Sequence, residues 1–137
     1  MPEAGNEWGT KRRPRSIGPM IDRDRALAVA REWLDAWNAH DPERVVSHFA
    51  ENVIVVSPLL EQLRPNSKGV MSGKREVLEY YRDGLAAAGD LHFELVDVCA
   101  SVTEVVIVYR NHRGVLVTES LEFDGDEVII VRVAYGV

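Results

Sequence analysis

Residues 115–135 read Val115-Leu-Val-Thr-Glu-Ser-Leu-Glu-Phe-Asp-Gly-Asp-Glu-Val-Ile-Ile-Val-Arg-Val-Ala-Tyr135, and this stretch decides the fold. Apolar side chains occupy every second position from 115 to 123, apart from Glu119, which is the period of a half-buried strand. Asp124-Gly125 follows, and glycine tolerates the positive φ of a tight hairpin turn. The β-branched residues of 128–135 then predict a returning strand.

Two more apolar runs upstream of this hairpin predict strands over 91–102 and 104–112, so that four consecutive strands form an antiparallel meander. An earlier β-branched run, 52–57, predicts another strand, which Pro58 closes. Residues 58–72 are rich in proline, asparagine, serine and glycine, and this composition predicts a long loop.

Three helices are predicted before the meander. In the segment 22–39, apolar residues recur at spacings of three and four, which is typical of an amphipathic helix. A second helix is expected over 42–50, because Asp41 suits an N-cap and Pro42 suits the first helical position. A third is expected over about 72–88. Three helices packed on one face of a largely antiparallel sheet make an α+β fold.

The length of 137 residues is that of one domain, and the composition divides it into a flexible tail, 1–20, and a domain, 21–137. The basic run 11–15 in the tail is typical of a solvated segment or of a localisation or nucleic-acid patch. The formal net charge of −6 argues against a protein built mainly to bind nucleic acid or an anionic membrane. No apolar run is long enough to span a membrane and no signal-peptide pattern is present, so a cytoplasmic protein is expected.

The single cysteine and the four histidines predict neither a disulfide nor a metal site, because none of them has the spacing of a ligand pair. No metal and no other cofactor is therefore expected. Cys99 is expected to be a small buried residue. His40, His48, His92 and His112 are expected to lie at the surface. The stretch Arg110-Asn111-His112-Arg113 is expected to cap a hairpin, and the alternative is that it binds an anion.

Several segments of residues 21–137 together resemble one family. They are Trp33-Leu-Asp-Ala-Trp-Asn-Ala-His-Asp41, Val45-Val-Ser-His-Phe-Ala-Glu-Asn52, the strand 53–58, Ser72-Gly-Lys74, Leu121-Glu-Phe-Asp-Gly125 and Arg132-Val-Ala-Tyr-Gly136. In order and spacing they resemble the nuclear transport factor 2-like superfamily, in particular its SnoaL-like and ketosteroid-isomerase-like members. The resemblance implies a cone-shaped α+β barrel, in which a strongly curved sheet wraps around a pocket closed by the helices, and homodimers that pair through the sheet. Members isomerise ketosteroids, cyclise polyketides, dehydrate substrates or hydrolyse epoxides, and others only bind ligands or partners, so activity must be argued from the site.

Glu119 lies in the middle of an apolar strand face, where a charged carboxylate is costly to bury. Its pKa should be raised unless a cation pairs with it, and it is then a candidate general acid or base. The structural alternative is a Glu that reaches water at the sheet edge or pairs with Arg110 or Arg132. The resemblance favours the functional interpretation, since Glu119 matches the position where ketosteroid isomerases have a protonated Asp that binds an oxyanion.

Other positions of the isomerase motif differ in this sequence. Ser57 stands where the isomerases have their general base, an Asp before a proline, and Trp33 stands where they have a phenol, whereas Tyr81 keeps a supporting tyrosine. An unactivated hydroxyl is a poor base or nucleophile at neutral pH, and an indole cannot cycle a proton. These changes argue against ketosteroid isomerisation. The closing strand carries no Asp, and Arg132 is expected on its far face, which argues against epoxide hydrolysis.

The candidate pocket combines one acid with an aromatic lining. Glu119 and Ser57 are the predicted catalytic residues. The predicted ligand-binding residues are Trp33, Trp37, Phe49, Val55, Tyr81, Tyr109, Val117, Leu121 and Tyr135, with Val53 and Val133 beside them. Such a lining suits a small, flat, mostly apolar molecule with one or two polar groups, and the alternative for each aromatic side chain is core packing.

Two functions remain open from the sequence. The first is an enzyme that isomerises, dehydrates or cyclises a small hydrophobic substrate by acid/base chemistry, with Glu119 as the acid or base and Ser57, Trp33 and Tyr81 positioning the substrate. The second is a non-catalytic ligand-binding or dimerisation module of the same fold. The missing Asp favours the second function, and the lone carboxyl in the pocket favours the first.

Overall fold

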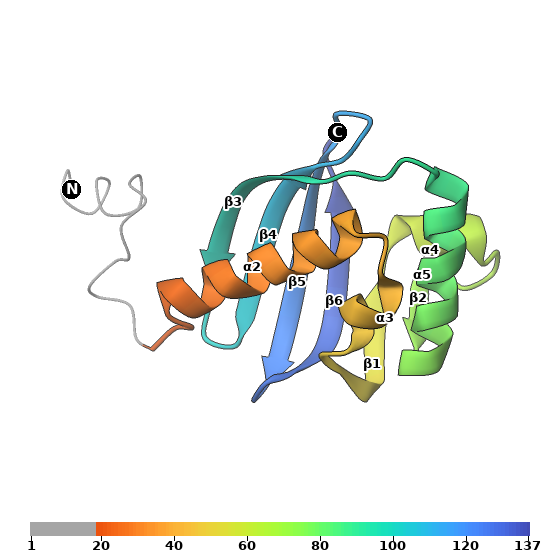
Figure 1. Ribbon diagram of the computed structural model, residues 1–137. Helices are drawn as coiled ribbons and strands as arrows, with labels where there is room; N and C mark the ends of the chain where they lie inside the picture. Colours follow the sequence, from red (N-terminus) through yellow and green to blue (C-terminus); the bar gives the residue numbers. More distant parts are fainter. Residues whose placement is uncertain (1–18) are drawn as a thin grey trace.

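Six strands form one sheet in the computed structural model, which describes residues 19–137 (Figure 1). In spatial order they are β2 (Val70–Ser72), β1 (Phe49–Val56), β6 (Glu127–Tyr135), β5 (Leu116–Asp124), β4 (Glu104–Arg110) and β3 (Glu94–Ala100). Neighbouring strands are antiparallel, except β1 and β6, which run parallel. The predicted meander and the α+β class are confirmed, whereas the cone shape and the strong curvature stay predictions. The expected flexible tail falls on residues 1–18, which lie outside the described residues, and on the first two described positions.

The helices are α2 (Arg23–Asn38), α3 (Pro42–Val46), α4 (Pro58–Leu63) and α5 (Lys74–Ala88). Helix α2 packs against β3 and β4, and α5 packs against β1 and α3 (Figure 1). The Asp22 carboxylate caps α2 by accepting the Arg25 N–H at 2.9 Å. Asp41 caps α3 as predicted, since its carboxylate accepts the Arg44 N–H at 3.1 Å. Local side-chain chemistry therefore fixes where the helices that enclose the core begin.

The segment 58–72 is not the predicted loop, because it contains helix α4 and strand β2. Ser57 caps α4, since its Oγ accepts the Leu59 N–H at 3.3 Å, and Pro58 occupies the first helical turn. Leu60 is fully buried, so tertiary packing stabilises a helix that is too short to show a periodic pattern. Residues 19–137 therefore contain four helices rather than the three predicted.

Several predicted boundaries also move; for example, the strand predicted over 52–57 is β1, Phe49–Val56, and the strand predicted over 104–112 ends at Arg110. The second helix ends at Val46 rather than at residue 50, because Phe49 already pairs with Val128 in the sheet. The first strand of the meander begins at residue 94 rather than at 91, because the Asn38 side chain bonds both the N–H and the carbonyl of Phe93. These side-chain bonds replace the strand pairing that the apolar pattern predicts.

The expectation that Cys99 is buried is wrong. Cys99 is exposed on the edge strand β3. Its neighbours Val98 and Ala100 pack against the core, so alternation turns Cys99 toward the outer face of the sheet.

Strand β5 places its alternate side chains as predicted. Val117, Glu119, Leu121 and Phe123 are buried, and the residues between them are partly exposed. Within residues 19–137, Glu119 and Ser57 are the polar or charged side chains that belong to the buried class. Burial of such groups costs free energy unless they are hydrogen-bonded, so the surroundings of these two residues are the first candidates for a functional site.

Candidate functional site

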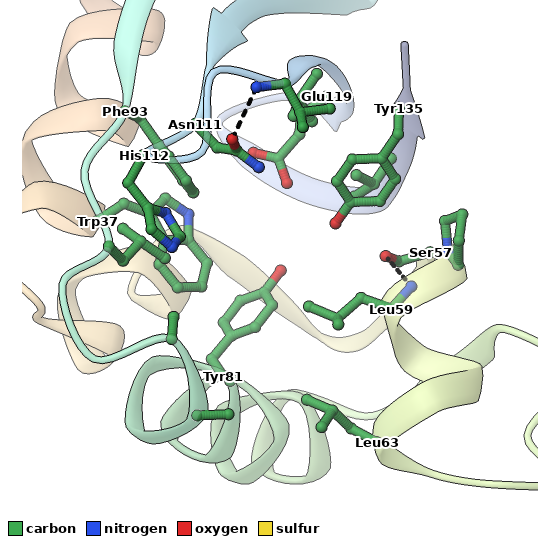
Figure 2. A pocket seen from close by; sticks show the side chains of 18 of the residues that line it. Trp37, Ser57, Leu59, Leu63, Tyr81, Phe93, Asn111, His112, Glu119 and Tyr135 are labelled. Carbon is green, nitrogen blue, oxygen red and sulfur yellow. Dashed lines mark hydrogen bonds between the residues drawn. The ribbon is translucent and has the colours of Figure 1, made fainter. Parts of the chain in front are cut away.

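A cavity of about 600 Å³ lies between the inner face of the sheet and helices α4 and α5 (Figure 2). Side chains of β1, β4, β5 and β6 line one wall, and α2, α4, α5, the segment before β3 and the turn between β4 and β5 line the rest. The volume and the largely apolar and aromatic lining are typical of sites that bind a small organic molecule. In the part of the chain that the structure describes, no group of three or more His, Cys, Asp or Glu side chains is placed to hold a metal ion.

Glu119 lies near the centre of the sheet, opposite Ile107 of β4 and Val133 of β6, and its side chain lines the cavity. The Trp33 Nε1–H donates to its Oε2, and the Tyr109 phenol lies close enough to the carboxylate to stabilise its charged form. Burial raises the pKa of Glu119 from its ordinary value of 4.5 to about 7. Trp33 and Tyr109 act in the opposite direction, because both stabilise the charged form.

The structural alternative for Glu119 does not hold, because neither arginine considered as its partner pairs with it. Arg110 donates to the Gly114 carbonyl at 3.1 Å, and Arg132 lies 3.8 Å from the Glu104 carboxylate. Exposure at a sheet edge is excluded as well, since only 6% of Glu119 is accessible to solvent. Within residues 19–137, the carboxyl is therefore buried without a cation.

Two tyrosine hydroxyls accompany this carboxyl. The Tyr81 phenol extends from α5 into the cavity, toward the side on which Glu119 lies (Figure 2). Burial, together with the nearby charge of Glu119, raises the pKa values of Tyr81 and Tyr109 well above their ordinary range. Both phenols therefore keep their protons at neutral pH. The Tyr81 O–H can donate a hydrogen bond to a ligand oxygen, whereas the Tyr109 O–H faces the Glu119 carboxylate.

Ser57 follows β1 at one end of the cavity and is 3% exposed. Besides capping α4, its hydroxyl lies close enough to the phenols of Tyr80 and Tyr135 to influence their pKa values. Burial raises the pKa of Tyr80 to about 12, so this phenol does not act as a base at neutral pH. Among residues 19–137, the titratable groups beside the Ser57 hydroxyl are phenols, and no base that would activate this hydroxyl lies next to it.

The predicted ligand-binding residues divide into two groups. Those that line the cavity beside Glu119 are Trp37, Val55, Tyr81, Tyr109, Val117, Tyr135 and Val133. Trp33 and Leu121 instead line a second cavity, of about 280 Å³, and Phe49 and Val53 line neither. A role in binding stays a prediction for the first group.

The second group is displaced for simple geometric reasons. Trp33 reaches the Glu119 carboxylate from α2 and lies outside the lining of the main cavity. Leu121 is two residues beyond Glu119 on the strand, which is about 7 Å farther along. Phe49 stacks on Trp33, with ring centroids 5.9 Å apart and planes at 22°, and is packed inside the core. The expectation that all these side chains share one pocket is therefore wrong.

Sequence reasoning missed several cavity residues, most clearly His112. The other three histidines are exposed as expected, but the His112 side chain is only 16% exposed and lines the cavity together with Asn111. The alternation of β4 gave a usable signal for Asn111, because it lies two residues after the inward-facing Tyr109. Leu59 and Leu63 were missed because α4 was taken for a loop.

Comparisons with solved structures agree with this fold. A SnoaL-like protein of unknown function from Burkholderia thailandensis E264 is 36% identical, with a TM-score of 0.81 over 88% of this chain and 100% of that one. An NTF2-like protein from Anabaena variabilis is 18% identical, with a TM-score of 0.68 over 85% of this chain and 93% of that one. A proposed ketosteroid isomerase from Kribbella flavida is 17% identical, with a TM-score of 0.67 over 83% of this chain and 79% of that one. At these last two identities the likeness shows the NTF2-like fold alone.

One curated protein matches in sequence, but it is much longer than this chain. The chain is 26% identical to the replication factor C large subunit of Methanosarcina mazei over 125 residues, and this alignment covers 91% of the chain. The chain spans only 17% of the length of that relative.

The SnoaL-like domain family matches residues 30–136, which is most of the chain. The protein therefore belongs to the family of SnoaL-like domains.

Proposed function

We propose that the protein binds a small, mostly apolar molecule in the cavity beside Glu119 and transfers a proton on it through that carboxyl. The reaction is an isomerisation, a dehydration or a cyclisation that needs no metal. The cavity of about 600 Å³ has the size for such a molecule, and its aromatic walls suit a flat one.

The observation that carries this proposal is the environment of Glu119. The carboxyl is buried, lies beside the cavity, pairs with no cation in residues 19–137, and has a pKa of about 7. A general acid or base is most effective when its pKa lies near the working pH, because both protonation states are then populated. A carboxyl that served only to stabilise the fold would be expected to have a cationic partner or access to water.

One carboxyl is sufficient for each of the three reaction types. In an isomerisation, the carboxylate removes a proton from one carbon and the resulting acid returns it to another. In a dehydration, the same proton passes to the departing hydroxyl group. In an aldol-type cyclisation, it passes to the alkoxide that forms when the new carbon–carbon bond closes. In every case Glu119 ends in the state in which it began, and the O–H group of Tyr81 can stabilise a developing negative charge on oxygen.

The ketosteroid isomerase mechanism that the resemblance implies does not fit the residues at two of its positions, Ser57 and Trp33. Ser57, at the position of that mechanism's base, caps α4 and interacts with two phenols. Trp33, at the position of its phenol, donates to Glu119 instead of facing the main cavity. We therefore assign Ser57 a positioning role and place proton transfer on Glu119.

A thermal-shift screen of apolar carbonyl and phenolic compounds tests binding, and deuterium exchange tests catalysis. Compounds that stabilise the wild type are incubated in D₂O, and exchange at their carbon-bound protons is followed by NMR. We expect exchange with the wild type and at least a hundredfold slower exchange with Glu119→Gln, in keeping with the contribution of a general base. Glu122→Gln changes a carboxyl on the opposite face of the same strand and is the matched control. Equal exchange by wild type and Glu119→Gln would remove Glu119 from the chemistry.

The second candidate function is ligand binding without catalysis. One observation favours it: Glu119 is the only carboxyl group among the described residues that line the main cavity, so no second acid or base assists it. In that case compounds stabilise the protein, and Glu119→Gln alters their affinity, while no carbon-bound proton exchanges. Binding without exchange throughout the screen would replace the first proposal by this one.

A further inference from the structure

A second group of polar side chains lines the cavity at the end away from the cap of α4, as Figure 2 shows for Trp37 and His112. The ring centroids of Trp37 and Phe93 are 6.1 Å apart, and the Phe93 ring stacks on the Tyr109 ring with a centroid distance of 4.2 Å. Asn111 and His112 follow Tyr109 along the chain and line the same cavity. Contacts from α2, β4 and the segment before β3 thus bring these three polar side chains to one region.

Two of these side chains carry buried nitrogen atoms without a partner. Trp37 is 7% exposed, and its Nε1–H has no hydrogen-bond acceptor within residues 19–137. Both ring nitrogens of His112 are likewise buried and unpaired in that part of the chain. The nearest carboxylate oxygen, Oδ1 of Asp90, is 3.8 Å from Nε2, which is too far for a hydrogen bond. Buried donors left unpaired cost free energy, and an acceptor supplied by a ligand would remove that cost.

Asn111 adds a donor whose direction is fixed by the turn. Its Oδ1 accepts the backbone N–H groups of Arg113 at 2.9 Å and Val115 at 3.0 Å, and the second of these bonds is drawn in Figure 2. Because the oxygen is occupied by two bonds, the side chain offers its Nδ2 amide group as a donor. Arg113 also lines the cavity and is exposed, so the positive charge at this end lies at the rim.

We propose that this donor end, formed by Trp37, Asn111 and His112, binds a carboxylate group of the ligand. The inference rests on the proposed function and narrows its substrate class to small apolar carboxylic acids. A carboxylate offers about four lone-pair sites on two oxygens, which matches a group of several donors better than the single oxygen of a ketone. Hydrogen bonds to an ionised acceptor are also the stronger ones, and Arg113 adds a favourable charge. The apolar body of the acid then extends along the aromatic wall toward Glu119.

The test compares aryl- and alkylcarboxylic acids with their primary amides and methyl ketones, by calorimetric titration of the full chain. We expect the acids to bind at least tenfold more tightly than the matched amides and ketones. Trp37→Phe keeps a ring but removes the N–H, and His112→Leu removes both ring nitrogens, so each should weaken acid binding about tenfold or more. His112→Gln, which restores one donor, should recover part of the affinity. His92→Leu removes an exposed imidazole that lines neither cavity, so it should leave acid binding unchanged and is the matched control for His112→Leu.

The indole resonances give a readout that does not depend on the variants being as stable as the wild type. In a proton–nitrogen correlation spectrum, the Trp37 Nε1–H signal should move downfield when an acid saturates the protein. An unmoved signal, or acids that bind no more tightly than the matched ketones, would overturn the proposal that the donor end binds a carboxylate. Either result would leave the proposal of ligand binding near Glu119 intact. Absence of binding by every member of the panel would overturn both proposals together.

Discussion

Replacing Glu119 by Gln should remove a pH-dependent loss of stability from the protein. In the folded state burial raises the pKa of Glu119 to about 7, whereas in the unfolded chain it titrates near the ordinary value of 4.5. Between these pKa values the folded state holds a proton that the unfolded state has released. The free energy of unfolding therefore falls as the pH rises from 4.5 to about 7. Gln has the same shape and no charge, and its amide oxygen can still accept the Trp33 N–H, so the variant lacks this loss.

The magnitude follows from the two pKa values. At 1.36 kcal/mol per pKa unit, the interval from 4.5 to about 7 corresponds to about 3 kcal/mol of stability at alkaline pH. About a quarter of this loss has developed at pH 5, so roughly 2–3 kcal/mol remains to be observed between pH 5 and pH 8. This change is a large fraction of the stability of a typical domain.

Urea unfolding of both proteins at pH 5, 6, 7 and 8 measures the effect. Subtracting the two free energies at each pH cancels the other titrating groups, provided that Glu119 does not interact with them. Glu122→Gln, on the outer face of β5, should show no comparable pH-dependent difference from the wild type. A difference between wild type and Glu119→Gln that stays constant to within about 0.5 kcal/mol over this range would refute the reasoning. Glu119 would then titrate alike in the folded and unfolded states.

Three further predictions use the same protein. Trp33→Phe removes the N–H donor to Glu119, so it should lower the free energy of unfolding by about 1.5–3 kcal/mol at pH 8 and by less at pH 5; an equal loss at both pH values would argue against a bond to the charged carboxylate. Leu60→Ala should cost about 2–5 kcal/mol in urea unfolding, because this side chain is fully buried beneath α4, and a cost under about 1 kcal/mol would mean that α4 is poorly packed. Cys99 should react with an aromatic disulfide reagent in the folded protein nearly as fast as in the unfolded chain. Slow labelling that accelerates on dilution would instead support the expected homodimer through the outer face of the sheet.

The elements that could be predicted from the sequence are those whose burial repeats over several residues. The alternation around Glu119 identified β5, its inner face and its buried acid, because a strand covered on one side needs that period. Asp41 and Pro42 marked the start of α3 for a local reason, N-capping. Helix α4 was missed because one buried residue, Leu60, and a serine cap hold it in place, and neither leaves a periodic pattern.

The composition of the cavity could be predicted only in part, because it depends on how far apart the elements lie. Alternation correctly turned Tyr109 and Val117 inward, but it does not distinguish a side chain at the cavity wall from one in the core, as Phe49 shows. His112 lies two residues beyond Arg110, the end of β4, and alternation along the predicted strand 104–112 would turn it away from Tyr109, so tertiary packing brings it to the cavity. The partners of Glu119 were likewise set by packing, since Trp33 approaches it from α2.

The most direct test of the central claim is the titration of the Glu119 side-chain carboxyl carbon by ¹³C NMR between pH 4 and pH 9. The signal is assigned by its absence from Glu119→Gln, and the titration is repeated with a compound that stabilises the protein. A midpoint near pH 7 that moves when the compound binds is the result expected for a buried carboxyl beside an occupied cavity. A midpoint near 4.5 that no bound compound changes would contradict both the burial of Glu119 as a neutral acid and its place in the site.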